Sequence, residues 1–210
     1  MSVSMYTPIK LGYKDKKSQM EEMKKYGYYR DNSLSNDNEQ VYWNPTKKKL
    51  LYNVTGTHNL SDWGTDLWLA MGHLKDTNRY KEADTILAKS KAKYGVKKAK
   101  ITSHSLGTGI ANGIAKANDK VFGLNGGYTI GEKARANVKN IRTDGDWVSN
   151  FSPQGNTTTL KNPNWKTGNT LIDGYNAHNV DNIKDTSIKV DKNKGRYNTD
   201  YEIKYVNLVD

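Results

Sequence analysis

The fold class follows from residues 96–117, VKKAKITSHSLGTGIANGIAKA. A short strand is predicted over 96–102, and a helix of very small residues over 108–117. The five residues between them, Ser103-His-Ser-Leu-Gly107, therefore form a tight strand-to-helix turn. A serine in such a turn stands above the edge of a sheet, where a base can reach its Oγ. This pattern makes Ser105 a candidate nucleophile, and a Gly- and Ser-rich turn that merely opens a helix is the ordinary alternative.

Outward from this turn, predicted strands and helices alternate along the chain. The elements are a weak helix over 15–25, a β-hairpin with strands 40–43 and 50–54, a helix starting near residue 61, a helix over 78–94, and strands over 121–124 and 138–143. Such alternation is typical of a mostly parallel sheet with helices on its faces. The predicted fold class is therefore α/β, as one domain over 1–210. Residues 1–14 are expected to form an arm or edge segment, and residues 181–210 a polar hairpin extension.

The composition excludes several classes of protein. The chain has no Cys, which excludes disulfides, thiolate zinc sites and cysteine nucleophiles. No apolar run approaches the roughly 18–20 residues that cross a bilayer, and the first residues lack the apolar core of a secretory signal. The 33 Lys and Arg against 22 Asp and Glu leave a formal net charge of +11. This charge favours anionic partners, such as an anionic membrane surface or nucleic acid.

A second informative block lies upstream of the serine turn. Residues 54–67, VTGTHNLSDWGTDL, resemble the F-R-G-S/T-x-S-x-x-D/N-W-x-x-D block of the class 3 lipases, an α/β-hydrolase family. The order of the two blocks also fits that family, and the resemblance spans roughly residues 39–180. It is closest to the short, lid-poor proteins of this kind in large DNA viruses and their satellites. Thr55 stands in place of the common Arg and Ser103 in place of Gly, and neither change removes a catalytic group.

The resemblance implies a compact α/β-hydrolase fold with an oxyanion hole. Acyl transfer needs donors aimed at the oxygen of the tetrahedral intermediate. The backbone N–H of Leu106, directly after the serine, is one expected donor. Thr57 matches the family's oxyanion residue, and Asp66 matches the aspartate that holds that residue's side chain. In related lipases, the region after the oxyanion residue forms or adjoins the lid. Here this region contains Trp63, Leu67 and Trp68, which are expected either to contact lipid or to pack into the core.

The base is expected downstream of the serine, because this fold orders its triad Ser, Asp, His along the chain. Of the four histidines, only His178 follows Ser105. His58 and His73 precede it. His104, which lies beside the serine in the turn, is expected to point away from the site.

The orienting carboxylate is expected in residues 144–149, DGDWVS, after the predicted strand 138–143. This stretch resembles the family segment that carries the triad aspartate, and alignment on its valine selects Asp146. Asp144 and Asp173 remain open as alternatives.

The sequence thus predicts a serine hydrolase that cleaves a carboxylic ester, most specifically a lipid or phospholipid acyl ester, without a metal or organic cofactor. The alternative is a catalytically inactive lipid- or membrane-binding module with the same fold. Nucleic-acid binding is a weaker alternative, because the lysines over 89–100 come with no groove-reading motif or stacking platform. The protein is expected in the cytoplasm or carried in a virus particle.

Overall fold

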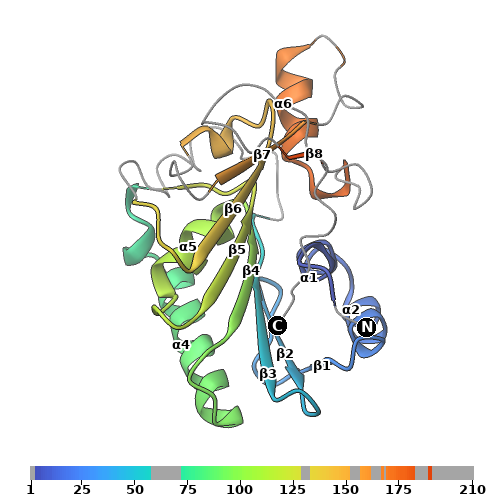
Figure 1. The fold of residues 1–210 in the computed structure, drawn as a ribbon, viewed down its shortest axis with the longest axis vertical. Coiled ribbons are helices and arrows are strands. Elements are labelled where there is room, and N and C mark those ends of the chain that lie inside the picture. The colour runs from blue at the N-terminus through green and yellow to red at the C-terminus, as the bar shows by residue number, and fades with distance from the viewer. Residues whose placement is uncertain are drawn as a thin grey trace.

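One mixed, mostly parallel sheet organises the chain (Figure 1). The computed structural model describes residues 3–57, 72–128, 133–151, 157–161, 167, 169–182 and 189–190. Within these residues the eight strands lie side by side in chain order. They are β1 Tyr29–Arg30, β2 Glu39–Asn44, β3 Lys49–Val54, β4 Lys100–His104, β5 Lys120–Leu124, β6 Val138–Thr143, β7 Thr157–Lys161 and β8 Lys189–Val190. Strands β3 to β7 are parallel, whereas β1, β2 and β8 pair antiparallel with their neighbours.

Helices cover both faces of this sheet. They are α1 Tyr6–Leu11, α2 Lys16–Lys24, α4 Asn78–Tyr94, α5 Leu106–Ile114 and α6 Thr170–His178, with short 3₁₀ helices η2 Leu74–Asp76, η3 Val148–Phe151 and η5 Val180–Asn182. Figure 1 shows α4 and α5 on one face and α1 and α2 on the other. The predicted α/β architecture, a mostly parallel sheet flanked by helices, is confirmed.

The core consists of two clusters, one on each face of the sheet. Because successive strand residues point to opposite faces, Leu50 and Tyr52 of β3 contact the cluster under α4 and α5. Leu51, between them, belongs to the cluster under α1 and α2. All three side chains are buried. A central strand covered on both faces therefore reads as a continuous apolar run rather than an alternating one.

The predicted bounds of an element agree with the structure where the sequence contains a helix cap or a turn. The long helix α4 runs from Asn78 to Tyr94 as predicted, because Thr77 accepts a hydrogen bond from the Tyr80 N–H at its start. Gly95 ends it in the left-handed conformation, with φ of 63°. The predicted hairpin is also present as β2 and β3.

Two predicted boundaries near the serine turn moved. Strand β4 occupies Lys100–His104 rather than 96–102, and α5 begins at Leu106 rather than at residue 108. The later end of the strand and the earlier start of the helix have one cause, because the chain turns at Ser105. The strand therefore continues to the residue before the serine, and the helix begins at the residue after it.

The segment 1–14, expected as an arm or edge segment, contains helix α1 in its described part. Val3, Tyr6 and Ile9, spaced three apart, are buried in the core under α1. Tyr6 and Ile9 lie on one face of α1, and Val3 precedes the helix. At the other end of the chain, residues 183–188 and 191–210 of the predicted polar hairpin lie outside the described residues. The described residues 189–190 form β8 against β7.

The helix predicted to start near residue 61 also lies outside the described residues over most of its length. Elsewhere, the helices that the structure describes are all too short or too polar to span a bilayer.

Candidate active site

The strand-to-helix turn places Ser105 in a backbone conformation that residues other than glycine rarely adopt. Its φ is 54° and its ψ is −132°. Such a conformation costs of order 1–3 kcal/mol and persists only where the surrounding structure holds it. The turn is held on both sides, because the Ser105 N–H donates to the Leu124 carbonyl and its own carbonyl accepts from the N–H groups of Thr108 and Gly127. The fold thus keeps this serine in a strained turn at the carboxyl end of β4.

Small residues around the serine permit this turn. A methyl group added to Gly107 would overlap the carbonyl oxygens of Val54 and Thr55, so the start of α5 lies directly against the end of β3. A methyl group added to Gly56 would come within 2.6 Å of the Ser105 Cβ. Ser103, in the place usually taken by glycine, fits because its buried hydroxyl donates to the Phe122 carbonyl at 3.4 Å.

Asp146 is the carboxylate that contacts His178. Its Oδ1 lies 3.0 Å from His178 Nδ1, and both side chains are at most 1% exposed. The carboxylate also accepts hydrogen bonds from the Val148 N–H at 3.1 Å and from the Ser149 hydroxyl at 2.5 Å. It therefore has one fixed orientation, with one oxygen aimed at the imidazole.

The two rival carboxylates lie elsewhere. Asp144 is exposed, and Gly145 with φ of 88° turns the chain between it and Asp146. Asp173, in the first turn of α6, accepts from the backbone N–H and hydroxyl of Thr167. Asp173 therefore forms local hydrogen bonds at the start of α6.

His178 is the last residue of α6, and its backbone carbonyl is held from two directions. The Asn125 side-chain amide donates to the carbonyls of Ala177 and His178 at 2.9 and 3.2 Å. Asn125 Oδ1 accepts from the Thr143 N–H at 2.7 Å. Since Asn125 follows β5 and Thr143 ends β6, this one amide ties α6 to the carboxyl edge of the sheet.

The second contact to that carbonyl comes from His104, which does not point away from the site as the sequence analysis expected. His104 Nε2 lies 3.0 Å from the His178 carbonyl oxygen, and the two rings are 4.7 Å apart. The other ring nitrogen, Nδ1, lies 2.7 Å from the Tyr13 hydroxyl. Burial and the nearby His178 lower the pKa of His104 to about 3. Burial likewise raises the pKa of Tyr13. Both groups are therefore neutral at ordinary pH.

The expected oxyanion donors lie at the two segments next to the serine. Leu106 is the first residue of α5, where backbone N–H groups have no partner inside the helix. Thr57 is exposed and follows Gly56, whose N–H donates to the Tyr13 hydroxyl at 2.7 Å.

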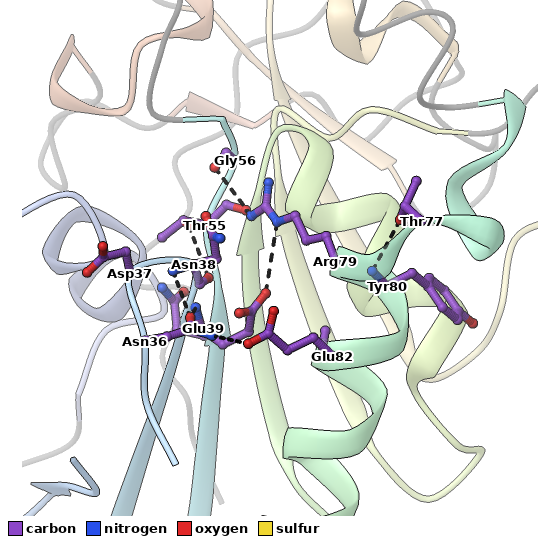
Figure 2. A network of polar contacts seen from close by, with 12 residues as sticks. Asn36, Asp37, Asn38, Glu39, Thr55, Gly56, Thr77, Arg79, Tyr80 and Glu82 are labelled. Carbon is purple, nitrogen blue, oxygen red and sulfur yellow. Dashed lines mark hydrogen bonds and ion pairs between the residues drawn. The ribbon is translucent and has the colours of Figure 1, made fainter. Parts of the chain in front are cut away.

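An arginine from α4 holds the other side of this segment (Figure 2). Arg79 Nη2 donates to the Thr55 carbonyl at 2.5 Å, with the Gly56 carbonyl at 3.4 Å. Its Nε lies 3.9 Å from the buried carboxylate of Glu39.

Several residues singled out from the sequence lie outside the described residues: His58, Trp63, Asp66, Leu67 and Trp68. Their expected roles in oxyanion support and lipid contact remain predictions. His73 is exposed, and its Nδ1 lies 3.8 Å from Asp76 Oδ2. In the described part of the chain, no group of three or more His, Asp or Glu side chains could hold a metal ion.

Three residues that hold these segments were not predicted from the sequence: Tyr13, Arg79 and Asn125. Tyr13 lies in a segment without a clear pattern, and Arg79 looks like one more basic residue on a polar helix. Asn125 carried a usable signal, since an Asn-Gly-Gly turn follows a buried strand at residues 125–127. Asn tolerates the positive φ of 46° that it adopts there.

Comparisons with known proteins give fold-level likeness at low identity. No protein-family model matches the chain, and no curated protein matches it. Among solved structures, a mutant form of MDLA from Penicillium cyclopium is 12% identical, with a TM-score of 0.45 over 89% of this chain and 81% of that one. A structure described as a fungal lipase is 11% identical, with a TM-score of 0.44 over the same shares of the two chains.

Proposed function

We propose that this protein is a serine hydrolase that cleaves carboxylic esters, with Ser105, Asp146 and His178 as its triad. The observation that carries the proposal is the buried Asp146–His178 contact of 3.0 Å. It is linked through His104, whose Nε2 lies 3.0 Å from the His178 carbonyl, to the next residue, Ser105, which is held in a strained strand-to-helix turn. A buried histidine with one nitrogen on a carboxylate is the arrangement that activates a serine in this chemistry.

The reaction divides among these side chains as follows. Asp146 accepts from His178 Nδ1–H, which leaves Nε2 as the nitrogen that takes the Ser105 proton as the hydroxyl attacks the ester carbonyl. The imidazolium then returns this proton to the leaving alcohol, and an acyl-serine forms. In the second half of the reaction, His178 takes a proton from water as the water attacks the acyl-serine, and then gives this proton to Ser105. The acid is released and the serine is restored. Asp146 stabilises the transient positive charge on the ring.

The negative charge that develops on the carbonyl oxygen needs fixed donors. The N–H of Leu106, at the start of α5, supplies one, and the favourable end of the helix dipole adds to it. The N–H of Thr57 supplies the second. Gly56, its neighbour, is held at its N–H by Tyr13 and at its carbonyl by Arg79. These contacts support a preorganised loop.

The substrate class that the sequence resemblance implies is a lipid or phospholipid acyl ester. The test is turnover of a panel of short- and long-chain esters and phospholipids by the wild type, Ser105→Ala and Ser103→Ala. We expect Ser105→Ala to lose on the order of 10⁴–10⁶ in kcat, since removal of a triad member has that cost. Ser103→Ala is the matched control, because it removes a buried hydroxyl two residues away.

Covalent labelling sharpens this experiment. A fluorophosphonate should modify the wild type and Ser103→Ala at Ser105, as seen by mass spectrometry, and leave Ser105→Ala unlabelled. Full turnover by Ser105→Ala would refute the proposal. Vesicle binding by a wild type that neither turns over esters nor labels would instead favour the inactive lipid-binding module.

A further inference from the structure

Three hydrogen bonds connect the segment at Gly56, next to Ser105, with the end of α6. The Gly56 N–H lies 2.7 Å from the Tyr13 oxygen, the Tyr13 hydroxyl 2.7 Å from His104 Nδ1, and His104 Nε2 3.0 Å from the His178 carbonyl. The groups come from four separate places: the segment after α1, the end of β3, the end of β4 and the end of α6. This chain therefore runs from the expected oxyanion loop to the backbone of the expected base.

The partners at its two ends assign every proton along it. A backbone N–H can only donate, so the Tyr13 oxygen accepts a hydrogen bond from Gly56. The Tyr13 hydroxyl then donates its own hydrogen bond to His104 Nδ1. A carbonyl can only accept, so His104 carries its ring proton on Nε2 and donates it to His178. All donors thus point the same way, an order in which each bond polarises and strengthens the next.

Ring packing fixes the same three side chains. The rings of Tyr13 and His104 meet edge-on, with centroids 5.6 Å apart and an interplanar angle of 86°. The rings of His104 and His178 are 4.7 Å apart. His104 is buried, and it directly precedes the serine in the chain. A shift of its ring would consequently disturb the serine, the base and the oxyanion loop together.

From this geometry we infer that Tyr13 and His104 are positioning residues that hold the oxyanion loop at Gly56–Thr57 in register with His178. The inference rests on the proposed hydrolase function. Catalysis of acyl transfer needs the oxyanion donors and the base to hold their places to within about 0.5 Å. Arg79 contacts the carbonyl side of this loop, and Asn125 ties the end of α6 to the ends of β5 and β6. The Tyr13–His104 pair joins the two.

Tyr13→Phe is the first test, because it removes one hydroxyl without changing the ring. We expect kcat for a soluble ester to fall about 10- to 100-fold, with KM changed less than about threefold, since misplacement by ~1 Å has a cost of this size. Tyr52→Phe is the matched control. It also deletes a buried tyrosine hydroxyl bonded to a backbone carbonyl, that of Ala83, in the other core cluster. It should lose thermal stability but retain kcat.

Two variants of His104 separate positioning from simple packing. The amide of His104→Gln can still donate to the His178 carbonyl, whereas His104→Leu fills the space without a donor. We expect His104→Gln to retain at least tenfold more kcat than His104→Leu. In the wild type, ¹⁵N NMR of the histidine rings should show His104 as the neutral Nε2–H tautomer, and Tyr13→Phe should shift its Nδ1 resonance.

The outcomes are distinguishable. An active wild type whose Tyr13→Phe variant keeps full kcat overturns the inference and leaves the hydrolase proposal intact. So does equal kcat of the two folded His104 variants, which also serves if Tyr13→Phe does not fold. A wild type without turnover or fluorophosphonate labelling refutes the proposed function, and the positioning role falls with it.

Discussion

At the scale of single residues, the choice between Asp146 and Asp144 has a direct kinetic consequence. Asp146 is buried and contacts His178 Nδ1, whereas Asp144 is exposed in the Asp-Gly turn before it. We expect Asp146→Asn to lower kcat by roughly 10³–10⁴, because the imidazole loses the partner that holds its tautomer. Asp144→Asn should change kcat less than about twofold. Ester hydrolysis by the two purified variants, at matched fold by circular dichroism, checks this, and an equal loss in both would contradict the assignment.

His104 also predicts a pH-dependent stability. Its pKa is lowered to about 3 by burial and by His178, while an unfolded histidine has a pKa of about 6.5. Below pH 6.5 the unfolded chain therefore binds one proton more than the folded chain. The free energy of unfolding falls as the pH drops from 6.5 towards 3, by about 2–3 kcal/mol at pH 4.5 from this group.

Urea unfolding between pH 7 and 4.5 measures this contribution. The wild type should lose stability more steeply than His104→Gln, which has no titrating group at this position. Parallel curves for the two proteins would show that His104 does not remain neutral in the folded state. Asp31 does not interfere in this window, because hydrogen bonds from Lys93, Tyr94 and Ser33 outweigh burial and lower its pKa to about 2.

At the scale of elements, the close approach of α5 to β3 depends on Gly107. A methyl group there would overlap two carbonyl oxygens of β3 and the residue after it, and backbone atoms cannot move aside cheaply. We expect Gly107→Ala to destabilise the protein by about 2–4 kcal/mol, somewhat more than ordinary overpacking of a core. The melting temperature should fall accordingly, and ester turnover should fall with it, because the first turn of α5 carries the Leu106 N–H.

Gly113 of the same helix is the control for this substitution. The three atoms nearest to a methyl group there all belong to the far end of the partly exposed Tyr80 side chain, which can move aside. Gly113→Ala should therefore be close to neutral, since the higher helix propensity of alanine offsets the small rearrangement. Equal melting temperatures of the two variants would show that α5 and β3 can move apart to accept a methyl group at Gly107.

At the scale of the whole molecule, basic residues gather at the end of the sheet opposite Ser105. Lys100 and Lys120 begin the adjacent parallel strands β4 and β5, whereas Ser105 follows the end of β4. Burial, together with Lys49, Lys120, Lys47 and Lys98, lowers the pKa of Lys100 to about 8. These lysines are therefore close enough to repel one another.

We expect this end of the molecule to contribute to binding of anionic vesicles. With a net charge of +11, binding to anionic vesicles should exceed binding to neutral ones and should weaken as salt is added. Each lysine near an anionic surface contributes about 1 kcal/mol, so Lys98→Gln with Lys120→Gln should weaken vesicle binding at least tenfold. Turnover of a soluble ester should stay unchanged. Co-sedimentation with both vesicle types checks this, and salt-independent binding would contradict it.

The sequence by itself determined the local elements of this protein. The hairpin of β2 and β3, the helix α4 and the turn at Ser105 follow from caps, periodicity and turn residues, whose effects act over a few positions. Chain order then left His178 as the one histidine after the serine. Helix α6 was missed, because short helices depend on packing more than on propensity.

Only the tertiary structure decided which distant groups meet. Tyr13 and His104 lie 91 positions apart, and nothing near either residue indicates the other. Which aspartate of the Asp-Gly-Asp turn faces inward depends on the left-handed conformation of Gly145. This conformation directs Asp144 to solvent and Asp146 to His178. Such contacts arise from how whole elements pack across the sheet. Local sequence patterns do not encode that packing, because the partners are brought together only when the sheet and its helices close on one another.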